Sequence, residues 1–107
     1  MTKLSFEITD GHFTKLVVSG HSGYSDEGSD IVCAAISSQV NLAASVLEHG
    51  GCRFSMDVGE KTATVIIKLE DLSELGQTVF TALSEQFKAL ADEFPENVKV
   101  TVAERFR

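Results

Sequence analysis

The sequence is poor in cysteine and has no apolar core near its start. It contains two cysteines, and its first ten residues, MTKLSFEITD, lack the central apolar run of a signal peptide. Thiols stay reduced in the cytosol, so two cysteines without a secretion signal predict a cytoplasmic protein. No apolar run approaches the length that crosses a bilayer, and we therefore expect no membrane partner.

Basic residues are also scarce. Nine Lys and Arg stand against 16 Asp and Glu, which gives a formal net charge of −7. Lys and Arg supply most of the affinity for nucleic acid by neutralising phosphates, so this charge argues against a nucleic-acid partner. An acidic surface better suits a basic protein. The glycines between positions 20 and 28 are not followed by Gly-Lys-Ser/Thr, which excludes a Walker loop.

The remaining composition is that of one globular domain spanning residues 1–107. A chain of 107 residues can bury about 60–65% of its unfolded surface without disulfides or metal. The hydrophobic fraction of 43% and the charged fraction of 23% are ordinary for such a domain. We find no linker, low-complexity tract or internal repeat in the sequence.

Apolar residues that alternate with polar ones predict strands with one buried face. They fall at residues 4–8, 13–19, 52–58, 63–69 and 98–102. The dipeptides Asp10-Gly11 and Gly59-Glu60 predict turns, and each joins two neighbouring strands into an antiparallel hairpin.

Two stretches with apolar residues at steps of three and four predict helices. The first runs from Ile31 to Glu48, and its main apolar stripe is Ile36, Val40, Ala43 and Leu47. The stripe of the second is Leu72, Leu75, Val79, Leu83, Phe87, Leu90 and Phe94. Asp71 and Glu74 are its predicted capping pair, and Pro95 stops it. The order ββαββαβ predicts an α+β fold with two helices packed on a mostly antiparallel sheet.

The stretch from Gly20 to Ser37 holds a histidine and a cysteine in an arrangement that suits catalysis. It reads GHSGYSDEGSDIVCAAIS, with His21 after the second strand and Cys33 in the first turn of the first helix. Free amides and the helix dipole favour a thiolate at that position. Twelve positions (33 minus 21) are too many for one helical face. A loop that folds back can still bring the base and the nucleophile together.

The same residues also allow ordinary structural roles. A free cysteine in an apolar run, as Cys33 is, often acts as a small buried hydrophobe. His21 could be a satisfied histidine at a strand end. A zinc site built from His21, Cys33, His49 and Cys52 matches no compact metal motif, so we expect no metal. Cys52 is predicted to be structural.

Three parts of the stretch form a signature: Gly20-His21, the run from Asp30 to Ala34, and Ser37. They resemble the signature of the ribosomal-processing cysteine proteases, the Prp family. Gly23-Tyr24 and Gly28 fit the glycine-rich loop between its two halves, and Ser22 stands where a small apolar residue is usual. The order of elements is similar too, so the resemblance covers nearly all 107 residues.

The resemblance implies a function. The chain would be a cysteine endopeptidase that removes the N-terminal extension of a large-subunit ribosomal protein, a step in ribosome maturation. His21 would be the base and Cys33 the nucleophile, and no cofactor is needed. Members of the family are dimers, so the resemblance also implies a homodimer. The first helix also has a second apolar face, at Leu42 and Val46. This face needs cover from the other helix or from another subunit, and the second alternative agrees with a homodimer.

Other residues of the stretch are candidates for supporting roles. Asp30 either caps the first helix or orients His21, and free amides at the helix start, including that of Cys33, are candidates to stabilise an oxyanion. Ser37 either hydrogen-bonds at the site or is an ordinary helical serine. The predicted substrate loop includes Gly20, Gly23, Tyr24 and Gly28. The rival function is a catalytically silent binding module for a ribosomal protein or an assembly factor.

Overall fold

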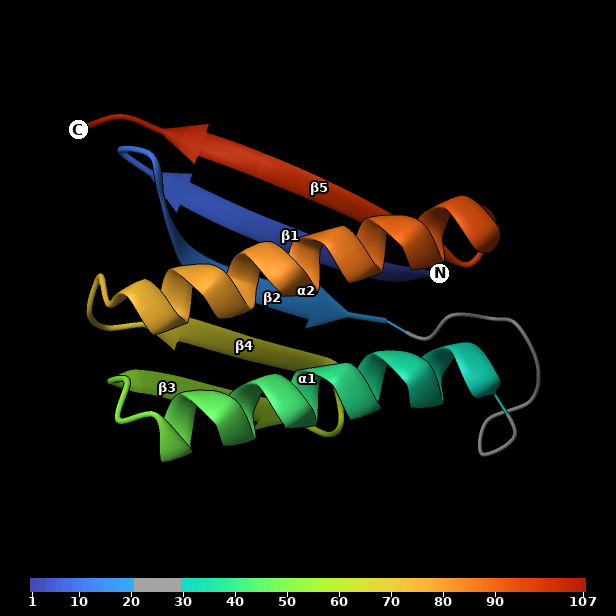
Figure 1. Ribbon diagram of the computed structural model, residues 1–107. Helices are drawn as coiled ribbons and strands as arrows, with labels where there is room; N and C mark the ends of the chain where they lie inside the picture. Colours follow the sequence, from blue (N-terminus) through green and yellow to red (C-terminus); the bar gives the residue numbers. More distant parts are fainter. Residues whose placement is uncertain (21–29) are drawn as a thin grey trace.

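The fold is a five-stranded sheet with both helices on one of its faces (Figure 1). The computed structural model describes residues 1–20 and 30–107. Its elements are β1 (Thr2–Thr9), β2 (His12–Ser19), α1 (Ile31–His49), β3 (Phe54–Gly59), β4 (Thr64–Leu69), α2 (Glu74–Glu93) and β5 (Val98–Arg105). The predicted α+β class and the order ββαββαβ are confirmed.

The strands lie in the order β3-β4-β2-β1-β5. The pairs β1–β2, β2–β4 and β3–β4 are antiparallel, as predicted for most of the sheet, whereas β1 and β5 are parallel. The β1–β2 hairpin turns at Asp10 and Gly11, whose φ angles are 51° and 82°. Two-residue hairpin turns of this kind require a positive φ at both positions, which explains the Asp-Gly pair. The first strand therefore lies inside the sheet rather than at its edge.

The core lies between the sheet and the two helices. Alternate strand residues, the predicted stripe of α1 and one side of α2 form it. Its buried apolar residues are Leu4, Phe6, Leu16, Val18, Val32, Ile36, Val40, Ala43, Leu47, Ile67, Phe80, Leu83, Phe87 and Val98. The ring centroid of Phe6 on β1 is 6.0 Å from that of Phe80 and 6.3 Å from that of Phe87, both on α2. Aromatic packing thus holds α2 against the middle of the sheet.

α2 begins later than the apolar pattern predicts. Leu72 lies before the helix and is 62% exposed, whereas Phe80, which the predicted stripe omits, is fully buried. The helix starts at Glu74 because Ser73 is its N-cap. The Ser73 hydroxyl accepts a hydrogen bond from the amide of Gly76 at 3.2 Å.

Asp71 does not cap this helix, so the predicted Asp71–Glu74 capping pair is wrong. Its carboxylate accepts hydrogen bonds from the amides of Arg53 and Ser73, at 3.0 and 3.2 Å. The bond from Arg53, followed by that from Ser73, lowers the pKa of Asp71 below its ordinary value. Asp71 therefore joins the segment before β3 to the segment before α2.

α1 is long and apolar enough, by length and composition, to cross a membrane. The prediction that no segment approaches that length is therefore wrong for these 19 residues. Core helices of globular domains meet the same criterion. Five residues of α1 are buried within this fold, so the apolar character of the helix has a use in the core.

Candidate active site

The end of β2 and the start of α1 lie at the same end of the molecule (Figure 1). The predicted base follows β2, and the predicted nucleophile lies in the first turn of α1. His21, Gly23, Tyr24 and Gly28 fall outside the described residues, so their predicted roles stay predictions. The described elements on either side of them end and begin at the same end of the molecule in Figure 1.

Cys33 is held in the first turn of α1 by a well-defined cap. It is the third residue of the helix, and its side chain is half-buried. Asp30, which is only 9% exposed, is the N-cap of α1. One carboxylate oxygen, Oδ1, accepts hydrogen bonds from the amides of Val32 and Cys33 at 2.9 and 3.1 Å. These bonds fix the helix start and with it the Cα position of Cys33.

The cap alters one expectation about catalysis. The sequence predicts the amide of Cys33 as an unoccupied donor for an oxyanion, but in this structure the amide donates to Asp30. The amide of Val32 is engaged in the same way. An oxyanion can use the Cys33 amide only when the Asp30 carboxylate gives way, and otherwise it needs other donors.

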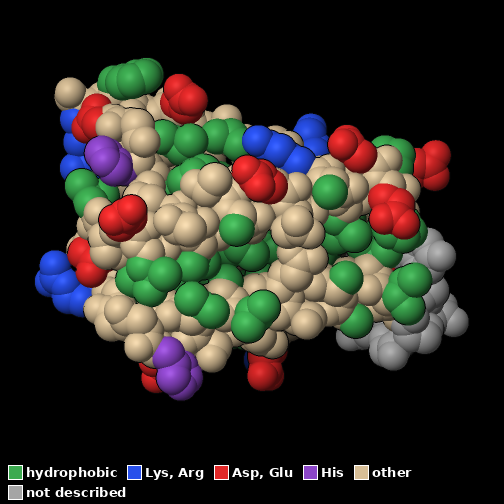
Figure 2. Space-filling model, in the orientation of Figure 1, with side chains coloured by type: hydrophobic (Ala, Val, Ile, Leu, Met, Phe, Trp, Pro, Cys, Tyr) green, Lys and Arg blue, Asp and Glu red, His purple; other side chains and the backbone are tan. Residues whose placement is uncertain are grey.

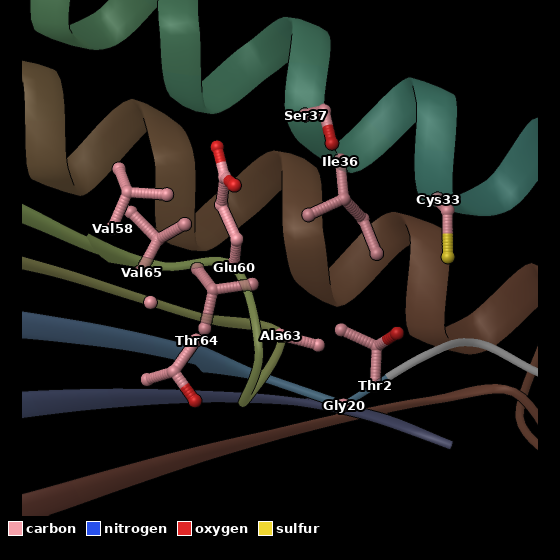
Figure 3. Close-up of a pocket in the computed structure, with 12 residues that line it drawn as sticks. Thr2, Gly20, Cys33, Ile36, Ser37, Val58, Glu60, Ala63, Thr64 and Val65 are labelled. Atoms are coloured by element: carbon pink, nitrogen blue, oxygen red, sulfur yellow. The ribbon is translucent and has the colours of Figure 1, made fainter.

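A cavity of about 300 Å³ opens beside Cys33 (Figure 3). It lies between α1 and the sheet, and Figure 3 shows the sulfur of Cys33 directed toward the sheet, on the side of Thr2 and Gly20. Its walls are mostly apolar. The lining residues are Thr2, Val18, Gly20, Cys33, Ile36, Ser37, Val58, Gly59, Glu60, Ala63, Thr64 and Val65. A space of this size and character next to a thiol suits an amino-acid side chain of a peptide.

A second cavity, of about 220 Å³, continues the first one along α1. The two share Val18, Ile36, Ser37, Val58 and Val65. The second adds residues one turn further along the helix and along β3, namely Val40, Asn41 and Met56. The described residues therefore form a groove that leads away from Cys33 between α1 and the β3–β4 hairpin.

Ser37 and Gly20 border this groove. Ser37 is exposed one turn after Cys33 and lines both cavities. Gly20 has a φ of +86°, and a Cβ at this position would lie 2.6 Å from the carbonyl oxygen of Met1. Its amide donates to the carbonyl oxygen of Ala63 at 3.0 Å. Only glycine fits here without moving the backbone. Steric exclusion of a Cβ therefore explains why glycine occupies this position of the predicted loop.

Sequence reasoning missed the wall of the cavity opposite α1. Thr2 reaches the site from β1, and Glu60 and Ala63 come from the turn between β3 and β4. The Gly59-Glu60 turn itself was predictable from the sequence. Its position across the cavity from α1 depends on pairing between distant strands and has no local signal.

Cys52 lies away from this site, at the opposite end of α1. It precedes β3, and its sulfur is 3.0 Å from the hydroxyl oxygen of Ser73, the N-cap of α2. This half-buried contact accords with the structural role predicted for Cys52. Among residues 1–20 and 30–107, no three His, Cys, Asp or Glu side chains are grouped closely enough to hold a metal ion.

A half-buried cysteine at a capped helix start, beside an apolar groove, is the arrangement of a hydrolase with a cysteine nucleophile. The model of the cysteine protease Prp family matches residues 1–99 of this chain. The chain therefore belongs to the Prp family of cysteine proteases.

Individual relatives agree with this family. The chain is 28% identical over 85 residues to the ribosomal processing cysteine protease Prp of Mycoplasma genitalium, covering 79% of this chain and 84% of that protein. The fold matches SMU.848 from Streptococcus mutans with a TM-score of 0.83 and 27% identity, over 98% of this chain and 96% of that one. The essential ribosomal processing protease Prp from S. aureus, solved with a covalently linked product peptide, matches with a TM-score of 0.90. At 19% identity, with 95% of this chain and 99% of that one covered, this last match shows the fold.

Proposed function

We propose that this chain uses Cys33 as nucleophile and His21 as base to remove the N-terminal extension of a large-subunit ribosomal protein. The observation that carries the proposal is the position of Cys33, in the first turn of a capped helix and at the mouth of an apolar cavity. The relative from M. genitalium is named for ribosomal processing, which supports the same class of substrate. An acidic chain with a net charge of −7 suits a basic precursor protein.

The chemistry follows from the two side chains. His21 takes the thiol proton, and the thiolate attacks the carbonyl carbon of the scissile peptide bond. The tetrahedral intermediate collapses when His21 returns the proton to the leaving amine, which leaves a thioester on Cys33. Water, deprotonated by His21, then hydrolyses the thioester and frees the second product. None of these steps needs a metal, a nucleotide or another cofactor.

The groove provides the binding part of this function. Its first cavity takes a substrate side chain close to the scissile bond, and the second takes another further along the peptide. We assign Ser37, which lines both cavities, a hydrogen bond to the peptide backbone. The proposal keeps Gly20, Gly23, Tyr24 and Gly28 as the substrate loop that the sequence predicts, and of these only Gly20 lies within the described residues. We place the reaction in the cytoplasm, without a nucleic-acid or membrane partner.

The direct test mixes the purified protein with a ribosomal protein precursor that carries its N-terminal extension. Intact-mass spectrometry should show loss of the extension in buffer without metal or nucleotide. A catalytically silent binding module would bind the precursor and leave its mass unchanged. Stable binding without any cleavage would therefore favour the rival function.

Asp30→Asn tests whether this residue orients His21 in addition to capping α1. Asn caps helices about as well as Asp, so the melting temperature should stay near that of the wild type. Both cap bonds end on Oδ1, and the second carboxylate oxygen is the one that would orient the histidine. Loss of its charge should lower kcat about 10-fold or more, as for other carboxylates that orient a catalytic histidine. An unchanged kcat would mean that Asp30 only caps the helix.

The outer face of the two helices supports a homodimer. A groove of about 430 Å³ runs between α1 and α2, lined by Gln39, Leu42, Ala43, Val46, Val79, Ala82, Leu83 and Gln86. Leu42 is 66% exposed and Val46 is 38% exposed, so α2 does not cover the second apolar face of α1. Figure 2 shows hydrophobic side chains gathered over both helices on this face. A second copy of the chain is the partner that the family resemblance implies for it.

Leu42→Glu should therefore disrupt the dimer, because it places a charge in an apolar interface. Sedimentation velocity at micromolar concentration should give a dimer for the wild type and a monomer for the variant. Leu72→Glu is a matched control, since Leu72 is 62% exposed and lies outside this groove. A monomeric wild type would reject the dimer, and equal dissociation of both variants would place the interface elsewhere.

A further inference from the structure

The cavity beside Cys33 has one carboxylate at its edge that the proposed mechanism does not use. Among the described residues that line it, only Cys33 and Glu60 carry ionisable side chains. Glu60 is exposed on the turn between β3 and β4. Figure 3 shows its carboxylate directed away from the sheet toward α1, on the side of Ser37. A negative charge therefore stands at the edge of a mostly apolar space.

The turn that carries Glu60 is tightly held. The amide of Thr62 donates to the carbonyl oxygen of Gly59 at 3.2 Å, and that of Ala63 to the carbonyl oxygen of Glu60 at 3.4 Å. Ala63 has a φ of 49°, and its carbonyl oxygen accepts the amide hydrogen of Gly20, at the end of β2. These bonds fix the Cα of Glu60 relative to the strand end that precedes His21. The backbone of Glu60 is thus held at the edge of the cavity, within reach of a bound substrate.

Glu60 has no basic partner within the described part of the chain. The ion pairs there join Glu7 to Lys15 and to Arg105, and Asp71 to Arg53. Lys61, the next residue in the sequence, forms no ion pair with Glu60. The charge of Glu60 is therefore available to a ligand, at little cost because the exposed carboxylate stays hydrated until a partner arrives.

We propose that Glu60 makes the protease prefer substrates with a lysine or arginine close to the scissile bond. The long methylene stem of such a side chain can lie on Val58, Val65 and Ile36, while its charged end reaches the carboxylate. An apolar side chain would use the same walls but gain nothing from Glu60. The inference rests on the proposed function, because it assumes that Cys33 is the nucleophile and that this cavity binds substrate.

The experiment compares peptides that differ by one side chain. The parent peptide spans the cleavage site of the precursor, and lysine or norleucine replaces each residue near the scissile bond in turn. Norleucine keeps the apolar stem and removes the charge. At one position the wild type should cleave the lysine peptide with a kcat/KM about 2–5-fold above that of the norleucine peptide, the gain of one exposed ion pair. The difference should lie in KM and shrink at high salt, because salt screens an exposed pair.

Variants assign the preference to Glu60. In Glu60→Gln the ratio of the two rates should fall to about one, and Glu60→Lys should prefer glutamate over glutamine at the same position. Glu70→Gln is the matched control, because Glu70 is an exposed carboxylate just after β4 that does not line the cavity. It removes the same charge and should keep the wild-type ratio.

The possible results separate the inference from the proposed function. If the wild type cleaves the peptides without preferring lysine at any position, the role of Glu60 is wrong and the protease assignment stands. The same holds if Glu60→Gln keeps the preference, or if Glu70→Gln loses it equally. If neither the precursor nor any peptide is cleaved, the proposed function fails and the role of Glu60 fails with it.

Discussion

Cys33→Ser should abolish cleavage of the precursor, with kcat lower by at least about 10³-fold, as expected when a covalent nucleophile is removed. A serine hydroxyl does not form the anion that a thiol readily provides, and nothing else in the described groove replaces it as a nucleophile of similar strength. The fold should persist, because Asp30 accepts hydrogen bonds from the backbone amides of Val32 and Cys33, which the substitution keeps. Intact-mass spectrometry of the precursor measures the rate, and thermal unfolding checks the fold.

Cys52→Ser is the matched control for this prediction. Cys52 is also half-buried and is the only other cysteine, but its sulfur contacts Ser73 at the start of α2. The Cys52→Ser protein should cleave at nearly the wild-type rate. If Cys33→Ser cleaves as fast as the wild type, Cys33 is not the nucleophile and the proposed mechanism is wrong.

Gly20→Ala should reduce kcat by about 100-fold, because a small displacement of a catalytic group is enough for such a loss. The new Cβ would lie 2.6 Å from the carbonyl oxygen of Met1, and the φ of +86° is unfavourable for alanine. The backbone must therefore shift at the residue directly before His21. The altered backbone would also strain the bond from the Gly20 amide to Ala63. Peptide cleavage under saturating substrate measures the effect on kcat.

Gly11→Ala separates backbone strain from displacement of the base. Gly11 has nearly the same φ, +82°, but a Cβ there would meet no atom within 4 Å. It lies in the β1–β2 turn, outside the groove. This variant should lose about 1–2 kcal/mol of stability from the left-handed conformation and keep its kcat. Equal losses of kcat in both variants would contradict the role assigned to Gly20.

The sequence was most informative where structure depends on neighbouring residues. The alternation of β1 and the stripe of α1 were predictable because burial repeats every two residues in a strand and every three or four in a helix. The start of α2 was not predictable in this way, because Asp71 and Ser73 are both residue types that cap helices. The carboxylate of Asp71 instead binds the amide of Arg53, 18 positions earlier in the chain, and Ser73 takes over as the cap. Such a competition between distant partners leaves no trace in the local pattern.

The residues of the candidate site also fall into two groups, those that local sequence predicts and those that only the fold reveals. The signature around Cys33 pointed to Gly20, Asp30 and Ser37, and each of these described residues lies at or beside the groove. Thr2 and Glu60 could not be found from the sequence, because they reach the cavity only through the order of strands in the sheet. The bond from the Cys33 amide to Asp30 was also missed, since a capping motif does not reveal which amides remain for catalysis.

The parallel pairing of β1 with β5 makes the cavity a late product of chain synthesis. Thr2, which lines the cavity, donates its amide hydrogen to the carbonyl oxygen of Asn97 at 2.8 Å. Its strand partner is Val98, 96 positions further along the chain (98 minus 2). A growing polypeptide therefore exposes β1 long before the strand that covers its open edge has been translated, and such distant pairing is slow to form. The wall beside Cys33 acquires its final shape only after β5 has emerged, so the groove beside Cys33 matures after nearly every other part of the sheet has been made.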